Sequence, residues 1–454
     1  MAGLLFPALI FALLNQGEAA VELLSFQSDI SSDDIHACSD PDLLSCQIVL
    51  VNFDAFKEDE ISLPGDWVLA KHDEDDTDGD FASVTFTDEE GSEATFTFKD
   101  GRAFGNVAFI NGSDFVLEDC NNFPGCHIWK EEDVQVFENI SGDDVVEAPQ
   151  NRQSLNAQET KLVEKGKADK TTIVTYSVKF YYTRQFAKVT DDIPLFISQI
   201  VAETNQGYKN SKVPLRMVAH CIEAAKLDDI KGGSKMLQTF RDSKGTIDKL
   251  RASADAAVLL VKSFDVCGIG YLRGWEGPKW AVSVTQKGCS LGYYTMGHEL
   301  GHNLGNMHDK VQGPNKYFKY GLGKHVGPDK LDGKGYMTIM AYQTATHRRE
   351  INYYSNPDIK FRGKYVTGSA DENNARVLTE TRFAMASVGD ESEKCALSMV
   401  TPTTTSTTTT TTPATTTTAT TANTKCKDKE CSCSSWPSSG FCTKVIFYIP
   451  DFTF

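Results

Sequence analysis

Residues 298–309 place three histidines at a spacing that suits metal binding. Side chains four residues apart lie on the same face of a helix, so His298 and His302 can present ring nitrogens to one metal ion. Gly305 can adopt the left-handed conformation that ends a helix, which turns the chain so that His308 reaches the same ion. Three protein ligands leave one position for water, as in catalytic zinc sites. The pattern therefore predicts Zn²⁺ as the cofactor.

Glu299 follows the first of these histidines and would lie beside the metal rather than on it. Zinc lowers the pKa of a bound water toward ~7, and Glu299 can accept the proton as the water attacks a peptide carbonyl. The same carboxyl group can then return a proton to the leaving amine. The alternative is a helix with ordinary histidines. A third histidine and a glycine at fixed spacing reduce the weight of that alternative sharply.

Residues 336–342, downstream of the third histidine, predict the methionine turn that metzincins place beneath their zinc ligands. Met340 is the candidate for this turn. A buried methionine is by itself more often core filling, but a position after His308 favours the role beneath the site. Tyr342 is predicted to hydrogen-bond the oxyanion or to approach the zinc.

Residues 171 to about 390 resemble a reprolysin-like metzincin, with Asp309 after the third histidine as in adamalysins. Residues 205–208, 267–269 and 354–357 resemble the peptidyl-Asp metallopeptidase branch at corresponding positions. The resemblance implies a zinc-dependent endopeptidase that acts on proteins or peptides. It also implies a primed-side specificity wall near residues 354–357 and suggests cleavage beside aspartate.

The elements that must position these residues predict a catalytic domain of α/β (α+β) class over residues 171–395. Apolar residues recur at helical spacing over residues 195–208, with Asp192 as the N-cap and Pro194 in the first turn. Strands that alternate with helices are typical of such a domain. The predicted strands are residues 172–178, 215–219 and 256–261.

Residues 20–165 are predicted to form a β-rich pro-domain that keeps the catalytic domain inactive. Polar and apolar residues alternate over residues 94–98 and 103–109, and Asp100-Gly101 marks the turn between them. The acidic run over residues 72–80 predicts a solvated loop. Calcium binding there is a minor alternative, because the spacing does not match an EF-hand loop.

Four further segments read as connections or extensions. Residues 158–170 are polar and lysine-rich, which predicts a linker accessible to proteases. Residues 1–19 predict a cleaved secretion signal, because their apolar run is shorter than the ~20 residues that span a bilayer. Residues 401–424 are nearly all threonine, as in O-glycosylated stalks. Residues 425–454 form a Cys-rich tail that resembles the first half of a ShK-toxin-like module.

Twelve cysteines in an exported chain favour disulfides over free thiols. Cys126 is a candidate to occupy the fourth zinc position and keep a precursor inactive. A disulfide with Cys120 is the favoured alternative, and steric blocking would then give latency. In the catalytic domain Cys267–Cys289 is the favoured pair, although two bridges are open among Cys221, Cys267, Cys289 and Cys395. Two glycosylation acceptors are present, Asn111 and Asn139.

The formal net charge of −17 argues against nucleic acid and anionic membranes as partners. Beyond the signal, no stretch is long enough to span a membrane. The predicted function is a secreted, extracellular zinc endopeptidase made as a zymogen, with no indication of its oligomeric state. A secreted binding or toxin-like protein with a structural metal site is the alternative, against which Glu299 counts. A zinc hydrolase for non-peptide substrates is a third hypothesis.

Overall fold

The computed structural model describes part of the chain, namely residues 20–26, 43–65, 67–77, 81–109, 114–119, 126–132, 144–147, 157–190, 192–243, 254–327, 335–344 and 346–389. The predicted secretion signal, threonine stalk and Cys-rich tail lie outside these residues. So do both glycosylation acceptors. None of the helices among the described residues has the length and apolar character needed to cross a bilayer.

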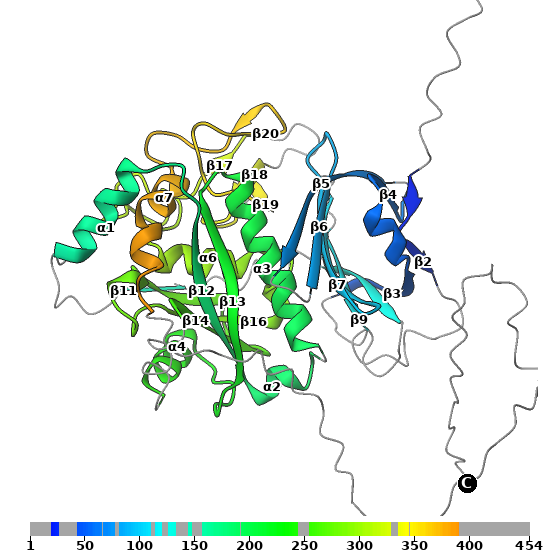
Figure 1. The fold of residues 1–454 in the computed structure, drawn as a ribbon, viewed down its shortest axis with the longest axis horizontal. Coiled ribbons are helices and arrows are strands. Elements are labelled where there is room, and N and C mark those ends of the chain that lie inside the picture. Colours follow the sequence, from blue (N-terminus) through cyan, green and yellow to red (C-terminus); the bar gives the residue numbers. More distant parts are fainter. Residues whose placement is uncertain are drawn as a thin grey trace, which may run out of the picture. The chain divides into compact units, whose positions relative to one another are not determined.

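The N-terminal described residues form a ten-stranded sheet, which we call the β-rich domain (Figure 1). Its order is β1-β4-β5-β6-β7-β8-β9-β10-β3-β2, and only the β1–β4 pair in it is parallel. The strands are β1 (Val21–Glu22), β2 (Leu24–Phe26), β3 (Leu43–Val51), β4 (Glu60–Leu63), β5 (Trp67–Thr77), β6 (Phe81–Thr87), β7 (Glu93–Lys99), β8 (Arg102–Ala108), β9 (Asp114–Asp119) and β10 (His127–Glu132), with a short helix η3 (Phe53–Lys57) after β3.

The β7–β8 hairpin shows why this region forms a sheet. Asp100 and Gly101 both have positive φ, 50° and 78°, as a two-residue hairpin turn requires. Phe96 is buried on the core side of β7. The β-rich prediction is thus confirmed. The loop prediction for the acidic run is wrong over residues 72–77, because β5 continues to Thr77 and pairs with β6.

The second sheet has six strands among the described residues, in the order β11-β15-β16-β14-β12-β13. All its neighbouring pairs are parallel except β15 with β16. The strands are β11 (Val145–Glu147), β12 (Val174–Tyr182), β13 (Leu215–Ala224), β14 (Ala256–Val261), β15 (Gly268–Leu272) and β16 (Val282–Gln286). The three predicted strands correspond to β12, β13 and β14, and the α/β character is confirmed.

Helices and two small sheets complete this part of the chain. The helices are α1 (Ala157–Ala168), α2 (Arg184–Ala187), α3 (Ile193–Asn210), α4 (Gly233–Asp242), η5 (Gly274–Glu276), η6 (Lys287–Cys289), α6 (Thr295–Asn303) and α7 (Asn374–Met385). The short strands are β17 (His325–Val326), β18 (Gly335–Thr338), β19 (His347–Ile351), β20 (Lys360–Phe361) and β21 (Tyr365–Val366).

Helix α3 begins where the sequence predicts. The side chain of Asp192 accepts a hydrogen bond from the backbone N–H of Leu195 at 3.0 Å, and Pro194 lies in the first turn. The helix is buried along most of its length, because one side packs on the six-stranded sheet and another on the β-rich domain (Figure 1). The prediction of this helix is confirmed.

The linker prediction is wrong over α1, which packs against α7. Gly166 has no Cβ, and a Cβ there would overlap the backbone of Glu380. The guanidinium of Arg382, which is fully buried, donates to the carbonyls of Asp169 and Thr172 at 2.8 and 3.1 Å. The sequence pattern misses α1 because Val163 is its one buried large apolar side chain. Tertiary contacts rather than amphipathicity hold this segment.

The β-rich domain contacts α3 through apolar and polar side chains. Phe104 of β8 meets Phe196 edge to face, with ring centroids 5.8 Å apart. Gln199 Nε2 donates to the carbonyl of Thr95 in β7 at 2.8 Å. Because such polar groups are desolvated and paired only in this arrangement, they fix how the domain docks on the helix.

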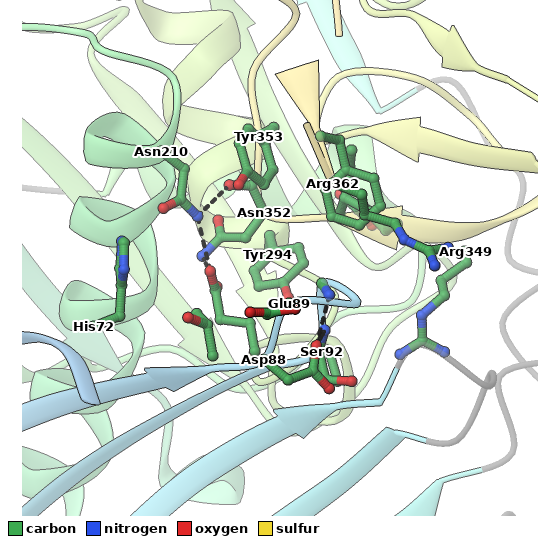
Figure 2. Close-up of a pocket in the computed structure, with 17 residues that line it drawn as sticks. His72, Asp88, Glu89, Ser92, Asn210, Tyr294, Arg349, Asn352, Tyr353 and Arg362 are labelled. Carbon is green, nitrogen blue, oxygen red and sulfur yellow. Dashed lines mark hydrogen bonds between the residues drawn. The ribbon is translucent and has the colours of Figure 1, made fainter. Parts of the chain in front are cut away.

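A pocket of about 140 Å³ lies at the same contact (Figure 2). Glu93 of β7 lines it and accepts hydrogen bonds from Asn210 and Asn352 at 2.8 and 2.9 Å. Burial raises the pKa of Glu93. Burial also raises the pKa of the nearby Glu203 of α3 to about 8. The contact therefore encloses carboxyl groups that favour the protonated form.

The raised pKa of Glu203 should make the free energy of unfolding depend on pH. The folded chain holds the proton of Glu203 more tightly than the unfolded chain, so its contribution is complete below pH 4.5 and is lost as the pH rises through about 8. For the full chain, we expect the melting temperature to fall less steeply over this pH range in Glu203→Gln than in the wild type. The control is Glu164→Gln, an exposed glutamate on α1. Equal slopes for Glu203→Gln and the wild type would contradict the assignment.

Candidate metal centre

Helix α6 presents two histidines on one buried face. His298 and His302 lie one helical turn apart, and their Nε2 atoms are 3.1 Å apart. The helix starts after Tyr294, whose φ is 48°. Its whole length is buried; the side chain of His302 has no exposed surface and that of His298 is 10% exposed.

A sharp turn after α6 brings in the third histidine. Gly305 has a φ of 106°, a conformation that favours glycine, and a Cβ there would lie 2.9 Å from the ring of Phe318. The chain then places His308 Nε2 at 2.9 Å from His302 Nε2. The structure thus brings together the three histidines that the sequence selects.

The other ring nitrogens show which way the lone pairs point. His298 Nδ1 lies 2.6 Å from the carbonyl of Ile339, and His302 Nδ1 lies 2.9 Å from the carbonyl of Asn306. A carbonyl only accepts, so each Nδ1 carries the proton and a neutral ring directs an Nε2 lone pair at its neighbour. Facing lone pairs repel unless a cation lies among them. The ligands of a tetrahedral ion at ~2.0–2.1 Å lie about 3.3 Å apart, close to the separations found. These residues fit zinc.

Asp144 is a fourth group at this centre, and the sequence analysis missed it. Its Oδ1 lies 2.7 Å from His308 Nε2 and 3.5 Å from His302 Nε2, and its Oδ2 lies 3.4 Å from His298 Nε2. One ligand atom from each of the four residues lies within 4.8 Å of all the others. No spacing rule links Asp144 to the histidine motif. Its only signal is an acidic residue directly before a short apolar run.

The pKa values of Asp144, His298 and His302 are shifted in different directions. Burial by itself raises the pKa of Asp144, but the rings of His298 and His308 hold it well below its usual range. Burial lowers the pKa of His302 to about 4, so this ring is neutral at pH 7, as a metal ligand must be. Burial also lowers the pKa of His298, but Asp144 more than offsets it and leaves that pKa raised. A bound cation would compete with this proton.

Glu299 lies beside the cluster in a space left by two glycines of β15. A Cβ on Gly268 would overlap Glu299 Oε1, and one on Gly270 would lie 3.2 Å from Oε2. Neither carboxylate oxygen has a hydrogen-bond partner in the part of the chain that the structure describes. Burial raises the pKa of Glu299 well above its usual value, and Asp144 adds to the shift. An unpaired buried carboxylate next to metal ligands suits proton transfer.

Met340 packs against α6, and Tyr342 stacks on one of the three histidines. Met340 is fully buried, and a Cβ on Gly301 of α6 would overlap its sulfur. The ring of Tyr342 stacks on that of His308, with centroids 4.1 Å apart. Burial raises the pKa of the Tyr342 phenol and Asp144 raises it further, so the hydroxyl keeps its proton. Their catalytic roles stay predictions.

Two of the short segments that resemble the peptidyl-Asp branch, residues 205–208 and 354–357, contact each other, and the second also contacts α6. Tyr208 donates to or accepts from the hydroxyl of Tyr176 at 2.8 Å and stacks on Tyr354, with centroids 5.5 Å apart. Tyr354 donates to the carbonyl of Gly297 in α6 at 2.8 Å. Residues 205–208 and 354–357 are thus joined behind the metal ligands. Because Tyr354 is fully buried, the specificity wall near it stays a prediction.

No cysteine among the described residues belongs to the cluster of Asp144 and the three histidines. The predicted Cys267–Cys289 disulfide is confirmed, and it ties the start of β15 to η6. Cys221 is disulfide-bonded as well. Cys126 is also disulfide-bonded, so it offers no free thiol to the metal centre. Its predicted partner Cys120 lies outside the described residues, as does Cys395.

Comparisons with known proteins show what the segment around the metal centre is similar to. Residues 196–309 match the reprolysin-like metallopeptidases of family M12B. A peptidyl-Asp metalloendopeptidase of Stenotrophomonas maltophilia (strain K279a) is 32% identical over 193 residues, which are 41% of this chain and 46% of that protein. The peptidyl-Asp metalloendopeptidase of Pseudomonas fragi is 26% identical over 184 residues, 40% of this chain and 98% of that protein.

A snake venom metalloproteinase, trimerelysin-2 of Protobothrops flavoviridis, is 28% identical over 134 residues, 28% of this chain and 67% of that protein. The chain spans about half the length of the Stenotrophomonas relatives, 46% in each case. The matched segment runs from α3 to the residue after His308.

Zinc binding by the full chain tests the three ligands. We expect His302→Ala to weaken zinc affinity by more than about 100-fold, because loss of a ligand costs more than loss of its outer-shell partner. The matched control is His72→Ala, which removes an exposed histidine. Zinc per chain is measured by elemental analysis after dialysis against a competing chelator. Wild-type zinc retention in His302→Ala would contradict the ligand set.

Proposed function

We propose, from the reprolysin-like metallopeptidase domain that the chain carries, that it is a secreted zinc-dependent endopeptidase. The observation that carries the proposal is the convergence of three Nε2 atoms next to an unpaired carboxylate on Glu299. In this proposal residues 171–395 form the catalytic domain, with α1 packed against it, and residues 20–165 belong to the pro-domain. The substrates are peptide bonds of extracellular proteins.

In the proposed reaction the metal and Glu299 have different roles. Zinc, when bound, polarises a carbonyl and makes water more acidic. Glu299 accepts the proton of the attacking water and delivers a proton to the leaving amine. Its raised pKa suits both steps, since the group must hold the proton between them. A purely structural metal site has no use for such a carboxylate, which disfavours the binding-protein alternative.

The substrate is proposed to bind as an extended segment along β15. On the side away from β16, β15 pairs with β11 in the full chain, so a substrate could pair with this edge of β15 only where β11 is displaced. Extended peptides commonly add to a sheet edge in this manner. Tyr342 keeps its hydroxyl proton beside His308 and is proposed to donate it to the developing oxyanion. The Stenotrophomonas and Pseudomonas relatives are named peptidyl-Asp metalloendopeptidases, which supports a preference for aspartate.

Peptide hydrolysis tests the proposed role of Glu299. The full chain is treated with a limiting amount of trypsin, the trypsin is then blocked with a serine-protease inhibitor, and hydrolysis of denatured casein is assayed. We expect Glu299→Ala to lose about 10²–10⁴ in rate while it retains zinc, because a general acid–base group contributes that much. A zinc chelator should abolish hydrolysis by the wild type.

Glu164→Gln serves as the control for this experiment, since it removes an exposed glutamate of α1. It should cleave casein like the wild type. Wild-type rates in zinc-loaded Glu299→Ala would exclude this residue as the base. A folded, zinc-loaded and trypsin-treated wild type that cleaves no denatured protein would contradict the peptidase function itself.

A further inference from the structure

Given the peptidase function proposed above, on which this step rests, we propose that Asp144 and strand β11 keep the full chain inactive. The Asp144 carboxylate takes the ligand position that the three histidines leave free. Strand β11 occupies the edge of β15 at which an extended substrate would pair. A single short segment thus blocks both the metal position and the substrate position.

The first observation is the placement of the carboxylate. Its oxygens lie between 2.7 and 3.5 Å from all three Nε2 atoms. The side chain is 15% exposed, so water has little access past it. A carboxylate oxygen is an ordinary zinc ligand, and with three histidines it completes four-coordination. A closed set of four protein ligands is the arrangement of structural zinc sites, in which no position remains for a reacting water.

The second observation is independent of the carboxylate and concerns the backbone. The carbonyl of Asp144 accepts a hydrogen bond from the N–H of Gly270 at 2.9 Å. Val145, Val146 and Glu147 then pair in register with residues 270–272 of β15. Strand β15 pairs with β16 on its other side, so without β11 it would be the edge of the sheet. β11 therefore uses the backbone groups that a bound peptide would need.

The far end of the segment lies at the surface. Glu147 Oε1 and Lys316 Nζ are 2.7 Å apart, but the two side chains are 32% and 63% exposed, so this ion pair contributes little to the position of the strand. Val146 packs, partly buried, on the apolar cluster around Ile269 and Tyr271. Backbone pairing with β15 and the packing of Val146 define the register of the strand, and this register places the carboxylate of Asp144 at the histidines.

The position of β11 in the chain makes this block removable. β11 follows the β-rich domain and precedes α1 and β12. Cleavage anywhere between Glu147 and β12 leaves Asp144 covalently joined to the β-rich domain. The histidines are then on the other fragment, so Asp144 can dissociate from them together with that domain. Before cleavage, the docking of the β-rich domain on α3 keeps Asp144 at high effective concentration. Cys126 is disulfide-bonded, so a carboxylate rather than a thiol would serve as the blocking ligand.

The test measures access to the metal in the intact chain. Zinc is replaced by Co²⁺, whose visible absorption spectrum reports its ligands, and acetohydroxamate is added as a small chelating probe. We compare the wild type with Asp144→Ala, with Asp144→Asn, which keeps the side-chain size should the alanine variant fail to fold, and with Glu147→Gln. The last variant is the matched control, because it removes a carboxylate of the same strand that faces Lys316.

We expect acetohydroxamate to alter the spectrum of both Asp144 variants at a concentration at least about tenfold below the one needed for the wild type. The reason is that a ligand tethered in the same chain binds about 10²–10⁴ times more tightly than the same ligand free in solution, so the probe must compete with Asp144 in the wild type. Glu147→Gln should respond more like the wild type than like the Asp144 variants. Equal responses of the wild type and both Asp144 variants would overturn the proposal. So would a Glu147→Gln response equal to that of Asp144→Ala.

A peptidase assay on the same samples separates this proposal from the function on which it rests. Uncleaved Asp144→Ala should hydrolyse a fluorogenic peptide at least about tenfold faster than the uncleaved wild type, by the same reasoning. If the probe reaches cobalt only in the Asp144 variants but no sample cleaves peptides, the inhibitory role of Asp144 and β11 is supported and the peptidase function is contradicted. If trypsin-treated wild type cleaves peptides while the probe reaches intact wild type freely, the peptidase stands and the block fails.

Discussion

The metal centre depends on three ring nitrogens that converge on one point beside the Asp144 carboxylate. Hydrogen bonds from the opposite ring nitrogens to Ile339 and Asn306 fix two of the rings, and the turn at Gly305 supplies the third. Because facing lone pairs repel, a cation among these ring nitrogens would relieve the repulsion, and the cluster suits metal binding. The packing of Tyr354 behind α6 and of Met340 beneath it serves the same geometry.

Two carboxyl groups near this centre differ in environment and therefore in charge. Asp144 faces the histidines, which keep its pKa low, whereas Glu299 lies against the glycines of β15 without a partner, and burial raises its pKa. One suits a ligand and the other a group that exchanges protons. One residue of β15, Gly270, contacts both carboxyl-bearing residues. Its missing side chain leaves space for Glu299, and its N–H donates a hydrogen bond to the backbone carbonyl of Asp144.

The sequence predicts those features that local patterns encode. The histidine spacing, the Asp192 cap, three strands and the Cys267–Cys289 pair all follow from short stretches or from residue type. Asp144 could not be predicted, because its approach to the histidines depends on a strand pairing between distant parts of the chain. Helix α1 and the full length of β5 were missed for the same reason: tertiary packing and a neighbouring strand outweigh weak or acidic local patterns.

X-ray absorption at the zinc K-edge of the intact, zinc-loaded chain measures the central claim most directly. We expect a first shell of nitrogen and oxygen only, at ~2.0–2.1 Å, with outer-shell scattering from three imidazole rings. In Asp144→Ala the three-ring signal should persist while one oxygen contribution changes. A sulfur ligand at ~2.3 Å, or a signal that accounts for fewer than three rings, would contradict the convergence of His298, His302 and His308 on one ion.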